Sequence, residues 1–239
     1  MKDNLLFTSA GDNTNFYKMW LNKNKTYDVC ICYYGNDVID KYKNDADIYF
    51  KEKGGKFQNF YKIWNENENI RQYKRYFIVD DDIEISTDDI NKLFKYLEEY
   101  DLWILQPSFD ATNPNCRISH DITKQDKTNI LRYVNFIEVN TMLFSHYAIS
   151  KCMQIYDPSL VGYGIDILFL WYLGTEHQDK YAIIDSISCV NPYERPNKSE
   201  QREIQKLQPD FMRLLVWKNI SRKYRIKPWN HKTYKEIKK

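Results

Sequence analysis

The sequence predicts an α/β domain built around a mainly parallel sheet. Three short runs of aliphatic, β-branched and aromatic residues, at 4–10, 27–34 and 76–79, each lead into a cluster of Gly, Asp or Asn. Such runs are typical of buried strands that end in a loop. Apolar residues at helical spacing lie between them, and alternating strands and helices favour parallel pairing. The length of 239 residues fits one domain, because single cores stop growing at about 250–300 residues.

The remaining elements follow from the spacing of apolar residues. Ser86 or Thr87 can cap a helix whose first turn contains Asp88 and Asp89. Further helices are expected over residues 15–22, 57–65, 146–156, 165–173 and 199–219. Further strands are expected over residues 102–105, closed by Pro107, over 133–145 as an extended pair, and over 181–184. The polar segment 113–129 is expected to be a loop that crosses the functional face.

The chain is expected to divide into a domain over residues 1–220 and a basic tail over 221–239. Lys and Arg predominate from residue 213 to the end of the sequence, where Glu236 is the single acid. Pro228 limits any further helix. Together with Trp217 and Trp229, the basic residues suit a peripheral contact with an anionic membrane surface. The alternative is a solvated helix that packs its Trp217 face on the domain.

Charge and composition exclude several classes of protein. The 35 Lys and Arg residues nearly balance 33 Asp and Glu residues, so the whole molecule has no global attraction to nucleic acid. The first apolar run is too short for a secretory signal, and no run approaches the ~18 apolar residues of a membrane span. A cytoplasmic protein is therefore expected. Five scattered cysteines without a CxxC pair argue against a disulfide framework and a zinc site.

The most informative feature is the triplet Asp80-Asp81-Asp82 at the carboxyl end of the apolar run 76–79. Ligands of open α/β sheets bind just outside such strand ends. Mg²⁺ or Mn²⁺ would offset the cost of clustered carboxylates, since one or two of them with substrate phosphates complete its coordination shell. If the strand continues, Asp80 and Asp82 lie on one side and Asp81 points elsewhere. The alternative is a solvated turn that caps the next helix.

A second feature is the pentapeptide Gly162-Tyr163-Gly164-Ile165-Asp166. Two glycines permit a tight turn and close approach of a substrate. Asp166 falls in the first turn of the following helix, where it can act as a general base on an acceptor hydroxyl. The alternative is an ordinary aspartate that the helix dipole stabilises.

Taken with these two motifs, several segments resemble a plant and bacterial family that is catalogued as a domain of unknown function and is similar to GT-A glycosyltransferases. The resemblance spans most of residues 4–191. It is carried by 8–12, 56–62, 77–86, 106–110, 136–140 and 162–166. It implies a GT-A-like three-layer α/β/α sandwich and a metal-dependent transfer of sugar from a nucleotide-diphosphate sugar to a glycan or glycoconjugate acceptor. It favours UDP-sugars over GDP-sugars.

The same resemblance assigns roles to residues. Asp80 and Asp82 are similar to a DxD pair that binds the metal and the nucleotide, with Asp81 beside them, and Asp166 resembles the base of an inverting enzyme. Lys56 is expected at the diphosphate, where the alternative is a solvated lysine before a helix. The expected nucleoside pocket consists of Ser9, Ala10, Asp12 and Asp37.

Other positions are expected to bind the metal or the acceptor. Relatives of the family carry a late histidine as a metal ligand, where this sequence has Asn191, a weaker oxygen ligand. His120, in the polar loop, is expected on the acceptor side together with Gly164. Glu138 follows a strand-like run and is expected either to contact a substrate hydroxyl or to form a buried ion pair.

The sequence leaves three other functions open. A phosphotransferase of the haloacid dehalogenase type has a similar apolar strand and DxD, but Glu84 stands where that family usually has Thr or Val. A nucleotidyltransferase would need a Gly-rich phosphate loop near the first strand, and Gly11 alone is not one. A non-catalytic carbohydrate- or metal-binding module could use the same acids, although Ile85 stands where a calcium loop would need glycine.

Overall fold

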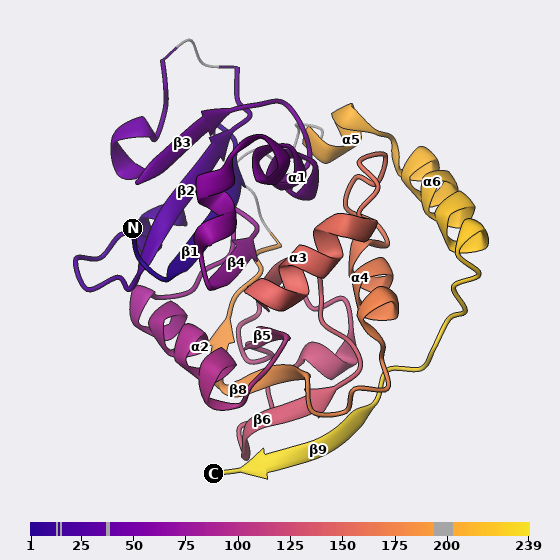
Figure 1. Ribbon diagram of the computed structural model, residues 1–239. Coiled ribbons are helices and arrows are strands. Elements are labelled where there is room, and N and C mark those ends of the chain that lie inside the picture. The colour runs from indigo at the N-terminus through magenta and orange to yellow at the C-terminus, as the bar shows by residue number, and fades with distance from the viewer. Residues whose placement is uncertain (13, 15, 37–38, 194–202) are drawn as a thin grey trace.

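The computed structural model describes residues 1–12, 14, 16–36, 39–193 and 203–239, without the side chain of Glu203. Within this part of the chain, nine strands form one sheet in the order β3-β2-β1-β4-β7-β5-β8-β6-β9 (Figure 1). The strands are β1 Asn4–Ala10, β2 Tyr27–Tyr33, β3 Ile48–Lys51, β4 Arg75–Val79, β5 Ile104–Phe109, β6 Asn129–Val134, β7 Thr141–Ser145, β8 Tyr181–Cys189 and β9 Thr233–Lys238.

The sheet is mixed, and the expectation of a mainly parallel sheet is confirmed only in part, because β6 and β7 run opposite to the other strands. Strands β3, β2, β1 and β4 are parallel neighbours, and β5 is parallel to β8. β7 is antiparallel to β4 and β5, and β6 is antiparallel to β8 and β9. The cause lies in the connection after β5, a loop whose only helical part is the 3-10 turn Asp121–Thr123. Without a crossover helix, the chain returns in the opposite direction.

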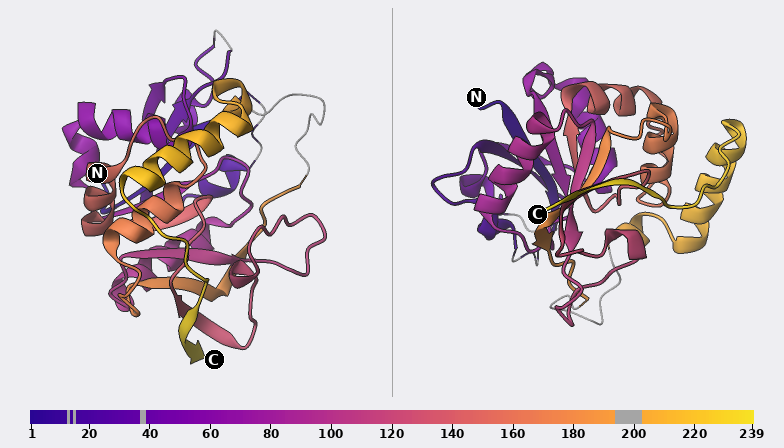
Figure 2. Two further views of the ribbon diagram at one scale, coloured as in Figure 1. Left: turned by 90° about the vertical axis from the view of Figure 1, so that its right-hand side faces the viewer. Right: turned by 90° about the horizontal axis from the view of Figure 1, so that it is seen from below.

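Helices cover both faces of the sheet (Figures 1 and 2). Successive residues of β1 point to opposite faces, so Leu5 and Phe7 belong to one hydrophobic cluster and Leu6 to the other. The first cluster includes α1, α3 and α4, and the second includes α2. The helices are α1 Lys56–Glu66, α2 Thr87–Glu99, α3 His146–Ile155, α4 Ile165–Leu173, α5 Glu203–Leu207 and α6 Asp210–Lys223.

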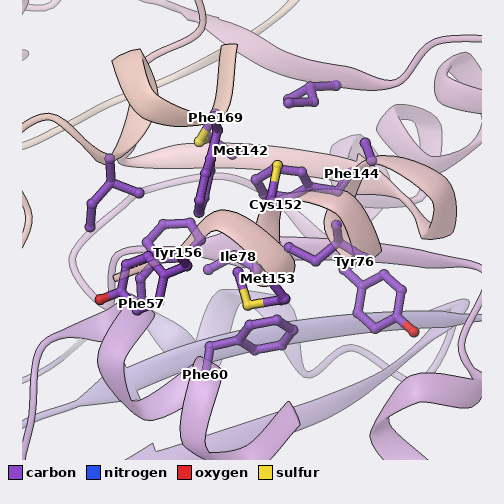
Figure 3. Packing of buried hydrophobic residues seen from close by; sticks show 14 of the residues in the cluster. Phe57, Phe60, Tyr76, Ile78, Met142, Phe144, Cys152, Met153, Tyr156 and Phe169 are labelled. Carbon is purple, nitrogen blue, oxygen red and sulfur yellow. The ribbon is translucent and has the colours of Figure 1, made fainter. Parts of the chain in front are cut away.

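Aromatic packing holds α1 and α4 against the sheet. Phe57, the second residue of α1, is buried with its ring centroid 5.4 Å from that of Phe169 on α4 and 6.4 Å from that of Phe144 on β7 (Figure 3). Tyr156 closes the same group at 6.3 Å from Phe57. Because large aromatic side chains in a close-packed core have few alternative positions, the start of α1 is fixed relative to α4.

Some elements differ from their expected bounds. β5 passes through Pro107, where a strand end was expected; Pro is tolerated because the pairing with β8 shifts register there. The helix expected over 15–22 is a single 3-10 turn, Tyr17–Trp20. The helix expected over 199–219 is two helices, α5 and α6, on either side of Pro209, and residues 199–202 lie outside the described part.

The basic segment 221–239 contributes a strand to the sheet, although it was expected to be a tail. It begins in the last turn of α6 and ends in β9, which pairs with β6 over most of its length. Trp229 donates from Nε1 to the carbonyl of Asn135, 3.2 Å away. No described helix is both long enough and apolar enough to cross a lipid bilayer.

Candidate functional site

A pocket of about 530 Å³ opens where β1 and β4 end and where α1 and α4 begin. This is the edge at which ligands of α/β sheets bind. Loops after β4, β5 and β6 form its walls, and α5 and α6 cover one side. Nine residues that the sequence singled out line it: Ser9, Lys56, Asp80, Asp81, His120, Glu138, Gly164, Asp166 and Asn191.

A salt bridge joins the end of β4 to the start of α1. Lys56 Nζ lies 2.8 Å from Asp80 Oδ1 and donates to the carbonyl of Val139 at the same distance. Gly55 is the N-cap of α1, so Lys56 is the first residue of the helix. Lys56 was expected either to contact a diphosphate or to lie in solvent. The lysine side chain is largely buried, so it belongs to the pocket wall.

The acidic triplet turns away from the strand direction after Asp80. The Asp80 amide donates to the carbonyl of Asn140, and the Ile83 amide returns to the Asp80 carbonyl at 3.3 Å. Asp81 and Asp82 form this turn, so the strand-like alternation considered for Asp80 and Asp82 does not occur. Asp80 and Asp81 line the pocket, and Asp82 is outside the lining.

The first strand brings only part of the expected nucleoside pocket together. Ser9 lines the pocket and accepts from Asn59 Nδ2 at 3.1 Å. Ala10 is fully buried, and Asp12 contacts the hydroxyl of Tyr33 outside the lining. Asp37 lies outside the described residues.

Tyr34 enters the pocket, and nothing in the local sequence pattern singled it out. Its ring lies over Gly11, where an added Cβ would be 2.7 Å from the Tyr34 hydroxyl oxygen. The Gly11 amide donates to Asp81 Oδ2 at 3.1 Å. A flat aromatic ring beside polar groups is a surface on which a nucleoside base can stack.

Two buried carboxylates, Asp166 and Glu138, also line the pocket. Asp166, at 8% exposure, accepts from the Ile167 amide at 2.9 Å, and Glu138, at 4%, accepts from Asn140 Nδ2 at 3.1 Å. Burial raises the pKa of Asp166 to about 6, and the negative charge of Glu138 acts in the same direction. At neutral pH Asp166 is therefore ionised but holds a proton more readily than an ordinary aspartate, which suits a general base.

His120 is the third member of this group. Its Nδ1 lies 3.4 Å from Glu138 Oε2, and this contact raises the pKa of His120 above its ordinary value. His231 stacks on Phe136 with ring centroids 4.0 Å apart and meets His120 edge-on at 5.3 Å. The sequence pattern did not single out His231 as a site residue, because only the pairing of β9 with β6 brings it here.

The backbone at Gly164 sets the position of Asp166. Gly164 is the N-cap of α4 with φ of 84°, a left-handed conformation that costs any residue with a Cβ roughly 1–2 kcal/mol. An added Cβ would also overlap the indole ring of Trp217 on α6. The last helix therefore packs directly on the turn that presents the carboxylate, which was not foreseeable from local sequence.

Three cations give the pocket a positive component. Lys56, Arg117 and Arg213 all line it, and the second and third were not expected. Arg213 reaches the pocket from α6 while pairing with Asp210 in the same helix turn. Positive side chains beside the N-terminus of α1 suit a phosphate-bearing ligand.

The oxygen atoms of the pocket fit a divalent ion only if a bound substrate supplies further oxygen ligands to that ion. Within the described residues, no group of three or more His, Cys, Asp or Glu side chains could hold a metal. Asp80 and Asp81 do border the pocket, and Asn191 lies on its wall. Mg²⁺ and Mn²⁺ sites of this kind use one or two carboxylates with substrate phosphates, so the two aspartates fit an ion bound together with a diphosphate.

Comparison with known proteins gives a fold and no family. No family model matches the chain, including any for the family of unknown function named above, and no curated protein matches it. The solved structure of S. aureus TarS 1-349 aligns with a TM-score of 0.56 and 12% identity, over 79% of this chain and 59% of that one.

Two further structures of the same protein agree. S. aureus TarS aligns with a TM-score of 0.54 and 14% identity over 92% of this chain and 43% of that one. TarS 1-349 in complex with UDP-GlcNAc aligns with a TM-score of 0.54 and 12% identity, over 94% of this chain and 73% of that one. This chain thus spans 59% of the first of these structures. At such identities the likeness shows the fold alone, a mixed α/β fold with a large sheet that TarS shares.

Proposed function

We propose that this protein is a glycosyltransferase that moves a sugar from a nucleotide-diphosphate sugar, with UDP-sugars favoured, to a hydroxyl of a glycan or glycoconjugate. The observation that carries the proposal is the pocket itself, which Lys56, Asp80 and the buried Asp166 all line. The fold is also that of a protein solved in complexes with UDP and with UDP-GlcNAc.

The donor would occupy the wall formed by β1, β4 and α1. Ser9 and Tyr34 would contact the nucleoside, and the diphosphate would lie against Lys56 and the first amides of α1. Asp80 and Asp81 would hold Mn²⁺ or Mg²⁺ together with the diphosphate. The ion would offset negative charge on the leaving group. Lys56 already balances Asp80 and would release it to the ion while keeping its own charge near the phosphates.

The acceptor would occupy the wall formed by Glu138, His120 and Gly164. Asp166 would take the proton from the attacking hydroxyl. Attack by a hydroxyl on the face of the sugar opposite the diphosphate inverts the anomeric centre. Glu138 and His120 form a polar pair beside Asp166, suited to orienting a sugar hydroxyl.

The direct test is a screen of nucleotide sugars by thermal shift, each with and without Mn²⁺. A donor that binds the folded state raises Tm by mass action. The donor that gives the largest shift is then incubated with acceptors, and product is detected by mass spectrometry and its anomeric configuration by NMR. Absence of a shift with every nucleotide sugar, with or without the ion, would refute the proposal.

Separate assays distinguish the rival functions. Release of pyrophosphate from nucleoside triphosphate would indicate a nucleotidyltransferase. Hydrolysis of a chromogenic phosphate monoester would indicate a phosphotransferase. Sugar or metal binding without turnover of any donor would indicate a non-catalytic module.

A further inference from the structure

Helix α6 has an outward face that no described element covers. Figure 2 shows the helix along the outside of the molecule, away from the sheet. Its inward face packs on the domain through Trp217 against Gly164 and through Tyr224, whose ring centroid lies 5.7 Å from that of Trp171. The outward face is separate from this packing and carries large apolar side chains.

That outward face is divided along the helix axis. Its first half is apolar, with Phe211 at 69% and Leu215 at 47% exposure, one helical turn apart, and Leu214 beside them at 39%. Its second half presents Lys218 and Arg222, exposed and one turn apart. Burial of such apolar side chains is favourable, and exposed clusters of them mark contact surfaces.

The charges indicate what the surface contacts. Beyond Asp210, which precedes the apolar group and pairs with Arg213, the exposed ionisable residues from 211 to 227 are all basic. They are Lys218, Arg222, Lys223, Arg225 and Lys227. Apolar side chains beside a cluster of positive charge match the boundary between acyl chains and anionic headgroups.

We propose that α6 docks its outward face on an anionic lipid surface. At 14 residues the helix is about 21 Å long, shorter than the ~30 Å hydrocarbon core of a bilayer, so it would lie in the interface. Phe211 and Leu215 would enter the headgroup boundary, and Lys218 and Arg222 would meet the phosphates. Since Arg213 of the same helix lines the pocket and Trp217 packs on Gly164 in its wall, docking would hold the pocket beside the membrane.

This surface replaces the one expected from the sequence. Trp217 and Trp229 were the aromatic residues considered for membrane contact, but both pack against the first hydrophobic cluster. The segment after α6 ends in a strand of the sheet. The proposed membrane contact is therefore made by α6 and not by the tail. It can be tested without a sugar donor and without catalytic turnover.

The test is co-sedimentation of the full chain with vesicles, without nucleotide sugar. We expect binding to phosphatidylcholine vesicles that contain phosphatidylserine, weaker binding at high salt, and little binding to phosphatidylcholine alone. Lys218→Gln with Arg222→Gln should weaken binding about 25-fold, at about fivefold for each charge. Phe211→Ser with Leu215→Ser should also weaken binding. Its effect should be largest at high salt, where charges are screened and the apolar contact contributes most of the affinity.

The matched control removes the same charge elsewhere. Lys23→Gln with Lys95→Gln alters exposed residues, one of them on α2, which packs on the other face of the sheet, and should leave binding unchanged. Equal losses in the control and α6 variants, or no binding to the anionic vesicles, would overturn the proposal. So would a dimer in sedimentation without lipid that Phe211→Ser with Leu215→Ser disrupts, because α6 would then pair with a second copy. Donor binding is measured separately, so failure here leaves the proposed function standing.

Discussion

Replacing Asp166 with Asn should increase the stability of the folded chain at neutral pH while lowering its activity. The carboxylate is buried beside Glu138, and its pKa rises from the ordinary 3.8 to about 6. A neutral side chain of nearly the same shape avoids the cost of burying the charge. The same substitution removes the proposed base, so kcat should fall by roughly 10²–10⁴ with donor affinity nearly unchanged.

The size and sign of the stability change follow from the pKa. A rise from 3.8 to about 6 corresponds to about 3 kcal/mol, at about 1.4 kcal/mol per pKa unit. Below pH 3.8 the carboxyl is protonated in both the folded and unfolded states. Between pH 3.8 and about 6 the unfolded state loses the proton first, so the contribution of Asp166 to the free energy of unfolding falls as pH rises. Asn does not titrate, so the free energy of unfolding of the Asn variant does not fall in this way.

The measurement is urea unfolding, followed by Trp fluorescence, of the original chain and of Asp166→Asn at pH values on both sides of this window. The difference in free energy of unfolding between the two should shift by about 3 kcal/mol in favour of Asn as pH rises through it. Asp179→Asn, at an exposed position, is the control and should give a nearly constant difference. A constant difference for Asp166→Asn as well would refute the argument that burial strains this carboxylate.

Three other predictions concern the walls of the pocket. Lys56→Met should weaken donor binding about 10–100-fold in a titration, since a charged hydrogen bond contributes about 1.5–3 kcal/mol. Asp80→Asn should remove most of the thermal stabilisation that Mn²⁺ and donor give together, whereas Asp82→Asn should keep it because Asp82 is outside the lining. Gly164→Ala should lower the free energy of unfolding by more than the roughly 1–2 kcal/mol of left-handed strain, because the new Cβ displaces Trp217.

Each of these has a matched comparison. Lys62→Met lies on α1 with an exposed side chain, and an equal loss of donor affinity there would remove the specific role of Lys56. Equal effects of Asp80→Asn and Asp82→Asn would instead support the hypothesis from the sequence, in which Asp80 and Asp82 bind the ion as a pair. Trp217→Ala added to Gly164→Ala removes the overlap between the new Cβ and the indole. The double variant should therefore lose less free energy of unfolding than the two single variants together. If the double variant is as unstable as the two single losses added together, the overlap is not the cause.

Local pattern was sufficient for several elements and for the parts of the site that lie on them. The run 4–10 is β1 and the run 165–173 is α4, and Ser86 caps α2 by accepting from the Asp89 amide at 3.1 Å. These follow from side-chain periodicity and from capping chemistry, which act within a few residues. The same local signals identified Asp80 and Asp166, which both line the pocket.

Contacts between distant segments were not accessible in this way. The antiparallel direction of β7, the pairing of β9 and the passage of β5 through Pro107 depend on partners far along the chain. His231 and Arg213 reach the pocket only because the segment after residue 203 returns across it. One sequence contains no periodic signal for such encounters, since they depend on tertiary packing.

The strand β9 has a consequence for how the molecule behaves in concentrated solution. It covers the backbone donors and acceptors of β6, which would otherwise form an open edge able to pair with the same strand of another molecule. β9 itself carries the exposed Lys235 and Lys238, and lysines on an outer strand discourage further pairing. Removing β9 would therefore be expected to make the chain self-associate into aggregates even if every group that lines the pocket from other strands stayed in place.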